Sequence, residues 1–215
     1  MKRSKSSRQW LADHEEDEYV KRARVEGYRS RSSYKLLEID KKFHILKAGA
    51  VVVDLGAAPG GWSQVAASKT GKKGQVLALD ILEMQPIRGV TAIRGDFTED
   101  GPVRALMALT GASRVDLVIS DMAPNLSGMN DIDQPRSMYL VELAFDFAVR
   151  VLRKNGVLLV KCFEGEGINE IRRLFGGRFA HVTNCKPRAS RATSREIYLL
   201  GRGFKGANDN QGDIR

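Results

Sequence analysis

Cysteine, histidine and long apolar runs are scarce in this chain of 215 residues. The two cysteines, Cys162 and Cys185, are too few for a disulfide framework and favour a reducing compartment. The three histidines are scattered, so we find no metal-ligand spacing and expect no metal. No stretch approaches the length of apolar chain that a membrane span needs, and no apolar run follows the basic start. We therefore expect a soluble, cytoplasmic protein without a membrane segment.

Acidic residues are the minority among the charged ones. The chain has 26 Asp and Glu against 35 Lys and Arg, which gives a net charge of +9. Such an excess favours a polyanionic partner, nucleic acid before others, although a basic surface that only improves solubility remains an alternative. The length and a hydrophobic content of 42% fit one domain with a real core, and we expect a monomer.

The composition divides the chain into three parts. Residues 1–29 form a basic, polar N-terminal arm that we expect to be flexible, residues 30–204 a globular domain, and residues 205–215 a polar tail. Within the arm, a short helix that docks on the body is conceivable through Trp10, Leu11, Tyr19 and Val20. From Ser32 on, apolar residues recur at helical spacing, and Lys35 lies at the edge of this stripe, where it can reach into a cleft.

Strand and helix patterns alternate from Val51 onward, which predicts a doubly wound α/β fold. The last two strands are joined by a loop alone and should pair as an antiparallel hairpin, whereas helical crossovers make the earlier strands parallel. The result is a seven-stranded sheet with an antiparallel last strand. We expect Asn155-Gly156 to stop the longest helix. The expected strands are 51–54, 75–80, 90–94, 115–121, 157–163, 179–185 and 197–200, and the helices between them are 62–68, 102–109, 136–153 and 168–175.

A glycine-rich turn, Gly56-Ala-Ala-Pro-Gly-Gly61, follows the first strand. It does not match the Gly-x-Gly-x-x-Gly pattern of dinucleotide sites, which disfavours an NAD-dependent oxidoreductase. Ligands of such folds bind beyond the carboxyl ends of the strands, where this sequence places four carboxylates. Each alone could be a helix cap, but together they would repel a pyrophosphate and suit a ligand with an ammonium and a sulfonium group, such as S-adenosylmethionine. These acids are Asp54, Asp80, Asp96 and Asp121.

Two lysines and a glutamate should join Asp121 at the same sheet edge. Lys161 falls on the strand face opposite Val160 and Cys162, near the strand's carboxyl end. Glu196 begins the antiparallel strand and so starts where the parallel strands finish, and Lys35 approaches from the preceding helix. A purely structural ion-pair network is the alternative. Burying two lysines beside two acids costs several kcal/mol of desolvation. Because a fold alone has little reason to incur this cost, we favour a catalytic cluster.

Several motifs carry a family resemblance. Asp54-Leu-Gly-Ala-Ala-Pro-Gly-Gly-Trp62, Ser120-Asp-Met-Ala-Pro-Asn125, Val160-Lys161 and Ser194-Arg-Glu-Ile-Tyr198 resemble, in this order, those of the FtsJ type of ribosomal RNA ribose 2′-O-methyltransferases. The resemblance extends from about Arg29 to about Gly203. It implies a class I methyltransferase fold, S-adenosylmethionine as the donor, and a uridine ribose of 23S rRNA, on the large ribosomal subunit, as the substrate.

The same resemblance implies roles for individual residues. A Lys-Asp-Lys-Glu tetrad falls on Lys35, Asp121, Lys161 and Glu196. The cofactor site, which includes the glycine-rich turn at Gly56, would be lined by Gly60, Trp62, Asp80, Asp96 and Asp121.

The chemistry of the reaction gives Lys161 its role. A ribose hydroxyl is a poor nucleophile, so its in-line attack on a sulfonium methyl needs a positioned base, for which Lys161 is the candidate. Stabilisation of a forming alkoxide by a charged Lys161 is the open alternative. Candidate contacts to RNA phosphates lie at the same edge, in Arg29, Arg31, Lys186, Arg188, Arg191 and Arg195.

Three other functions remain to be distinguished. An enzyme that methylates amines commonly carries two prolines after an Asn or Asp at the end of strand four, whereas this chain has Asp121-Met-Ala-Pro124. A 2′-O-methyltransferase could act on another RNA, such as tRNA. A non-catalytic ribosome-assembly module on the same fold would not need S-adenosylmethionine.

Overall fold

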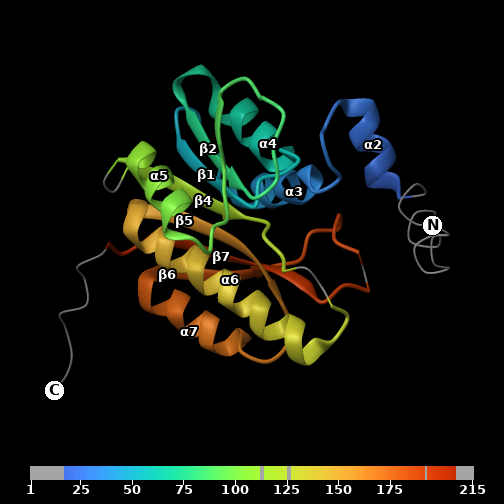
Figure 1. Cartoon of the computed structure of the whole chain (residues 1–215), viewed down its shortest axis with the longest axis vertical. Coiled ribbons are helices and arrows are strands. Elements are labelled where there is room, and N and C mark those ends of the chain that lie inside the picture. The colour runs from blue at the N-terminus through green and yellow to red at the C-terminus, as the bar shows by residue number, and fades with distance from the viewer. Residues whose placement is uncertain (1–16, 112–113, 125–126, 192, 207–215) are drawn as a thin grey trace.

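A computed structural model describes residues 17–111, 114–124, 127–191 and 193–206. They form one seven-stranded sheet in the order β3-β2-β1-β4-β5-β7-β6, with helices on both faces (Figure 1). The strands are β1 Val51–Leu55, β2 Gln75–Asp80, β3 Val90–Arg94, β4 Val115–Ser120, β5 Leu152–Phe163, β6 Phe179–Cys185 and β7 Glu196–Phe204. The helices are α2 Glu18–Glu26, α3 Ser33–Phe43, α4 Gly61–Thr70, the short 3-10 helix η1 Gly71–Lys73, α5 Asp100–Thr110, α6 Asn130–Val151 and α7 Ile168–Arg178.

The direction of the strands confirms the predicted topology. β1 to β5 pair in parallel, and β7 runs antiparallel between β5 and β6. In the β5–β7 pair, Lys161 lies opposite Tyr198 and Phe163 opposite Glu196. The start of β7 therefore lies at the edge where the parallel strands end.

Two apolar layers pack against the sheet, one on each face. The layer under α5, α6 and α7 includes Val160, Cys162 and Phe175. The layer under α3 and α4 includes Leu159 and Tyr198. Because side chains alternate along a strand, Lys161 points to the α3 side of the sheet, away from Val160 and Cys162, as predicted.

The end of the longest helix was predicted wrongly. α6 ends at Val151, and Leu152 already belongs to β5, where it pairs with Val115. Asn155, with φ of 65°, lies inside the strand, next to a shift in the β4–β5 register. The burial of Leu152 in the sheet outweighs the preference of Asn155-Gly156 for ending a helix. The Asn-Gly pair instead forms an irregularity within β5.

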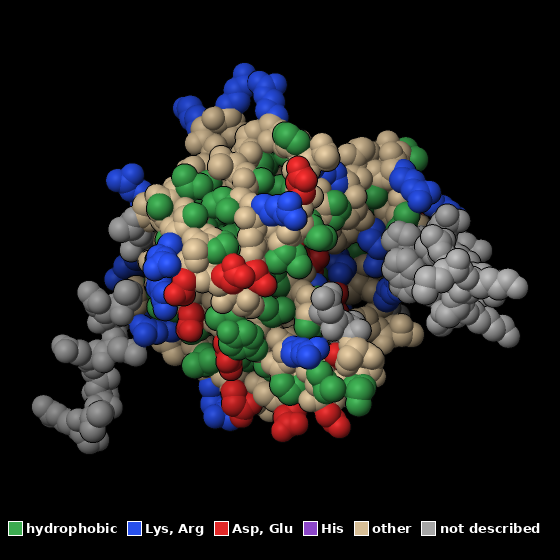
Figure 2. Space-filling model, in the orientation of Figure 1, with side chains coloured by type: hydrophobic (Ala, Val, Ile, Leu, Met, Phe, Trp, Pro, Cys, Tyr) green, Lys and Arg blue, Asp and Glu red, His purple; other side chains and the backbone are tan. Residues whose placement is uncertain are grey.

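Helix α2 docks on α3 within the range that we assigned to the N-terminal arm. Val20 and Ala23 are buried, and the ring of Tyr34 lies 5.4 Å from that of Tyr19 and 5.5 Å from that of Tyr28. Trp10, Leu11 and the last residues of the tail lie outside the described residues. Along the described segments, no helix is both long enough and apolar enough to cross a membrane. On the face shown in Figure 2, Lys and Arg side chains are interspersed with Asp and Glu.

Candidate active site

A cavity of about 480 Å³ opens at the carboxyl ends of the parallel strands. Its wall includes Gly56 after β1, Asp80 at the end of β2, Asp96 after β3 and Asp121 after β4, and α6 closes it with residues such as Tyr139. Three of the four predicted carboxylates thus face one cavity. The fourth, Asp54, is fully buried in β1 below it.

The glycine-rich turn is shaped by close backbone packing. Gly56 has φ of 74°, and a Cβ there would lie 2.6 Å from Cγ of Met122, the neighbour of Asp121. One carboxylate oxygen of Asp80 accepts a hydrogen bond from the backbone N–H of Ala58 (2.9 Å), and the other accepts one from Leu82 (2.8 Å). The turn is therefore held by the segment after β4 through Met122 and by the end of β2 through Asp80. Only a residue without a Cβ fits at Gly56.

Gly60 and Trp62 lie outside the cavity wall. A Cβ at Gly60, where φ is 107°, would collide with the side chains of Ile87 and Met84. Trp62 is 2% exposed, and its indole N–H donates to the carbonyl of Ser32 (2.8 Å). In this structure both residues hold the turn and the start of α4 in place, and their contact with a cofactor stays a prediction.

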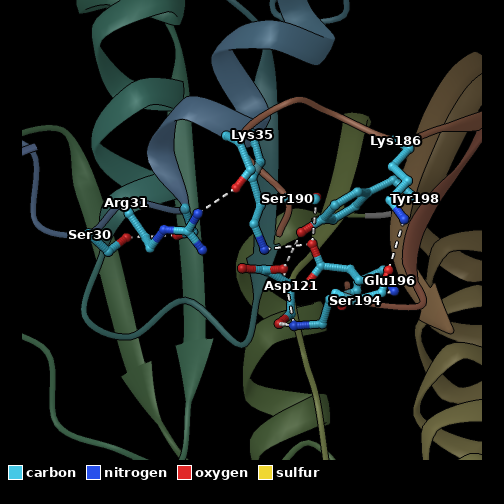
Figure 3. A network of polar contacts seen from close by, with 12 residues as sticks. Ser30, Arg31, Lys35, Asp121, Lys186, Ser190, Ser194, Glu196 and Tyr198 are labelled. Carbon is cyan, nitrogen blue, oxygen red and sulfur yellow. Dashed lines mark hydrogen bonds and ion pairs between the residues drawn. The ribbon is translucent and has the colours of Figure 1, made fainter. Parts of the chain in front are cut away.

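Four charged side chains meet beside the cavity: Lys35 from α3, Asp121 directly after β4, Lys161 from β5 and Glu196 from β7. Figure 3 labels three of them, Lys35, Asp121 and Glu196. Lys35 Nζ lies 2.6 Å from Oε1 of Glu196, and Lys161 Nζ lies 3.1 Å from Oδ1 of Asp121. Lys161 also donates to the backbone carbonyl of Asp121. The two lysines are only 7% and 8% exposed. The structure thus brings together all four residues that the sequence placed at this edge, and Asp121 belongs both to the cluster and to the cavity wall.

Two further side chains complete the cluster, and sequence reasoning missed both. The hydroxyl of Tyr198 donates to Oδ1 of Asp121 (2.7 Å), and that of Ser190 donates to Oε1 of Glu196 (2.8 Å). Tyr198 follows Glu196 by two residues on β7, so strand alternation could have placed it on the same face. Ser190 lies in the irregular loop before β7, where no periodicity gives a signal.

The electrostatics of the cluster keep Asp121 ionised. Burial raises the pKa of Asp121, but the ammonium groups of Lys161 and Lys35 and the Tyr198 hydroxyl outweigh it, so that the pKa lies below its usual range. The pKa of Tyr198 is raised well above 10 by burial and by the nearby Asp121 and Glu196. Tyr198 is therefore a protonated donor that holds a charged Asp121 in place.

The loop between β6 and β7, which carries Ser190, is held against α3 from two sides. Arg31 donates through Nη2 to the carbonyl of Ala189 (2.7 Å). The carboxylate of Glu38 accepts from the backbone N–H groups of Arg188 (2.6 Å) and Ala189 (3.2 Å). Because Ser190 is the next residue, this clamp sets the position of its contact with Glu196.

Replacing Glu38 with Gln should loosen this loop. The amide keeps one acceptor oxygen but loses the charge that strengthens hydrogen bonds to the two N–H groups, each worth about 1.5–3 kcal/mol when one partner is charged. We expect faster amide hydrogen exchange at residues 188–190, read by mass spectrometry, with exchange in β1 unchanged. Unchanged exchange in the loop would show that Glu38 does not hold it.

The predicted RNA contacts divide into two groups. Arg29 donates to the backbone carbonyls of Pro59, Gln85 and Pro86, at 2.6–3.2 Å, and Arg31 to that of Ala189. These two arginines thus have structural partners within the chain. The other four are exposed to solvent, although Lys186 also donates to the carbonyl of Ser194 (2.8 Å); they are Lys186, Arg188, Arg191 and Arg195.

The topology and the cavity at the strand ends are those of a Rossmann-like α/β methyltransferase. Residues 28–204 match the family of FtsJ-like methyltransferases, and the chain belongs to this family. The protein is accordingly a methyltransferase, and the family resemblance seen in its motifs is confirmed.

Curated relatives cover nearly the whole chain. One from Hahella chejuensis, named Ribosomal RNA large subunit methyltransferase E, is 55% identical over 206 residues, which are 96% of this chain and 100% of the relative. One of the same name from Pseudomonas aeruginosa (strain PAO1) is also 55% identical over 206 residues, with the same coverage.

Solved structures share the fold. A putative ribosomal RNA methyltransferase from Plasmodium falciparum is 30% identical, with a TM-score of 0.76, over 83% of this chain and 100% of that one. The pre-rRNA processing protein fibrillarin of Methanococcus jannaschii is 17% identical, with a TM-score of 0.56 over 81% of this chain and 76% of that one, and shows the fold alone.

Proposed function

We propose that this protein transfers a methyl group from S-adenosylmethionine to the ribose 2′-hydroxyl of a uridine in 23S rRNA, on the large ribosomal subunit in the cytoplasm. The observation that carries the proposal is the position of Asp121, which lines the cavity and at the same time pairs with the buried Lys161 at 3.1 Å. The names of the curated relatives support large-subunit rRNA as the substrate, and the net charge of +9 fits a polyanion.

The cavity fits S-adenosylmethionine in size and charge. Its volume of about 480 Å³ falls in the range of small-molecule sites. Asp80 and Asp96 would accept from hydroxyl or amino groups, and the carboxylates suit a ligand that carries an ammonium and a sulfonium group. When bound, the cofactor supplies an electrophilic methyl group. Gly56 lines the cavity without a side chain, so a ligand there can approach the backbone closely.

The four charged side chains would activate the ribose hydroxyl. As the ribose oxygen displaces the cofactor's sulfur from the methyl group, Lys161 would act as the base that takes the hydroxyl proton. The carboxylate of Asp121, which lies 3.1 Å from Nζ of Lys161, would balance the positive charge that Lys161 carries after it takes the proton. The pair of Lys35 with Glu196 and the Tyr198 hydroxyl fix the geometry that an in-line transfer needs.

Mapping the transferred methyl group tests this proposal. The protein is incubated with isotope-labelled S-adenosylmethionine and, in separate reactions, with unmodified large subunits, free 23S rRNA or tRNA. We expect one 2′-O-methyluridine in 23S rRNA, identified by mass spectrometry of nuclease fragments. Label on a base or protein amine, label in tRNA alone, or no transfer to any substrate would contradict the proposal.

A further inference from the structure

A second hollow of the surface, of about 710 Å³, lies on the α3 side of the sheet and is separate from the cavity described above. The C-terminal half of α3 forms one wall with Lys41, Lys42 and Phe43. The end of β6 and the loop after it form the other, from Asn184 to Arg188. We call this hollow the α3–β6 groove.

The α3–β6 groove has an excess of positive charge. Its four cationic side chains are exposed, and within the described part of the chain none of them forms an ion pair with a carboxylate. The acidic residue in the wall, Glu38, is already bound by the backbone N–H groups of the loop and, at 3.4 Å, by the hydroxyl of Tyr19. The four cations are Lys41, Lys42, Lys186 and Arg188.

An aromatic ring lies among these charges. Nζ of Lys42 lies 5.2 Å from the centre of the half-buried Phe43 ring, and the guanidinium carbon of Arg202 lies 5.4 Å from it. Cations beside an aromatic ring combine attraction for phosphates with an apolar surface for the sugar or base. This composition suits a nucleic acid strand better than a small acidic metabolite or an apolar peptide.

One face of α3 connects the α3–β6 groove to the charged cluster. Lys35, Glu38 and Lys42 are three and four residues apart and so share a stripe of the helix. Lys35 and Lys42 are about 10 Å apart along the helix axis. This length corresponds to about three nucleotides of a stacked strand, at ~3.4 Å for each.

From this arrangement we infer that the α3–β6 groove binds the RNA segment next to the target nucleotide and contributes phosphate contacts outside the active site. The inference rests on the proposed function, because it takes RNA to be the substrate. It assigns to Lys41 and Lys42 a role in affinity for the substrate and none in the transfer step.

A pair of double variants with equal charge tests the role of the groove. Lys41→Gln with Lys42→Gln removes two groove charges, and Lys72→Gln with Lys73→Gln removes two adjacent exposed charges from η1. η1 precedes β2 and lies at the opposite edge of the sheet from the cavity. All four lysines are exposed, so we expect every variant to fold, which thermal unfolding checks.

The probe is transcribed 23S rRNA, and its dissociation constant is measured over a range of salt concentrations. For the groove variant we expect about 10- to 30-fold weaker binding near 0.1 M salt and a salt slope smaller by about 1.4, as for two lost phosphate contacts. The η1 variant should bind within about twofold of the wild type. With large subunits as substrate, KM should rise for the groove variant while kcat and cofactor affinity stay unchanged.

Equal weakening by both double variants, or by neither, would overturn the inference. A fall in kcat with unchanged RNA affinity would overturn it as well. Because binding is measured without methyl transfer, a wild-type protein that binds rRNA but does not methylate it would refute the proposed function separately. The difference between the two double variants would then still decide whether the groove binds RNA.

Discussion

Replacing Lys161 with Ala should lower the rate of methyl transfer by about 10²- to 10⁴-fold, the usual contribution of a general base. The substitution removes the amine that faces Asp121 at 3.1 Å and leaves the cavity wall intact, since Lys161 does not line it. Affinity for S-adenosylmethionine should therefore change by less than about threefold. Single-turnover kinetics on large subunits gives the rate, and calorimetry gives the affinity.

Lys154 provides the matched control for this substitution. It lies on the same strand, β5, but is exposed and belongs to the beginning of the strand, whereas Lys161 lies near its carboxyl end. Lys154→Ala should keep the wild-type rate. A Lys161→Ala protein that is folded and transfers methyl groups at the wild-type rate would leave the charged cluster as a structural ion-pair network.

Replacing Asp54 with Asn should remove a large pH dependence of stability. Burial raises the pKa of Asp54 to about 7, an effect that the hydrogen bond from Ser63 opposes and that Asp121 and Asp80 reinforce. The folded state therefore holds a proton that the unfolded state releases above about pH 4. This group favours folding fully below pH 4, and its contribution is lost as the pH rises through 7, by about 4 kcal/mol in all.

Denaturant unfolding at pH 4.5 and pH 8 measures this effect. The wild type should lose more stability than Asp54→Asn between the two values, whereas Asp146→Asn, a change at an exposed carboxylate on α6, should follow the wild type. Parallel curves for the wild type and Asp54→Asn would mean that Asp54 is ionised in the folded protein across this range.

The part of the site that follows from strand geometry could be predicted from the sequence. The alternation of side chains along β5 predicted that Lys161 lies on the other face of the sheet from Val160 and Cys162. The antiparallel hairpin predicted that Glu196 lies at the edge where the parallel strands end. The four charged residues come from α3, β5, β7 and the segment after β4. The rule that ligands bind at the carboxyl ends of parallel strands was nevertheless enough to predict that they lie together.

The parts that depend on loops and on tertiary packing could not be predicted. Arg31 and Glu38 hold Ala189 across 150 or more positions of the sequence. Local patterns of apolar and polar residues do not predict such contacts. The docking of α2 depends on tyrosine rings that meet only in the folded chain. The end of α6 was misplaced because a buried pairing of Leu152 prevailed over the turn propensity of Asn155-Gly156.

A crystal structure of the protein with S-adenosylmethionine bound tests most directly whether the cavity and the charged cluster form one site. We expect the cofactor in the cavity lined by Asp80 and Asp96, with the transferable methyl group within about 6 Å of Nζ of Lys161, so that a ribose oxygen fits between them. A cofactor bound elsewhere, or with its methyl group directed away from Lys161, would contradict this arrangement.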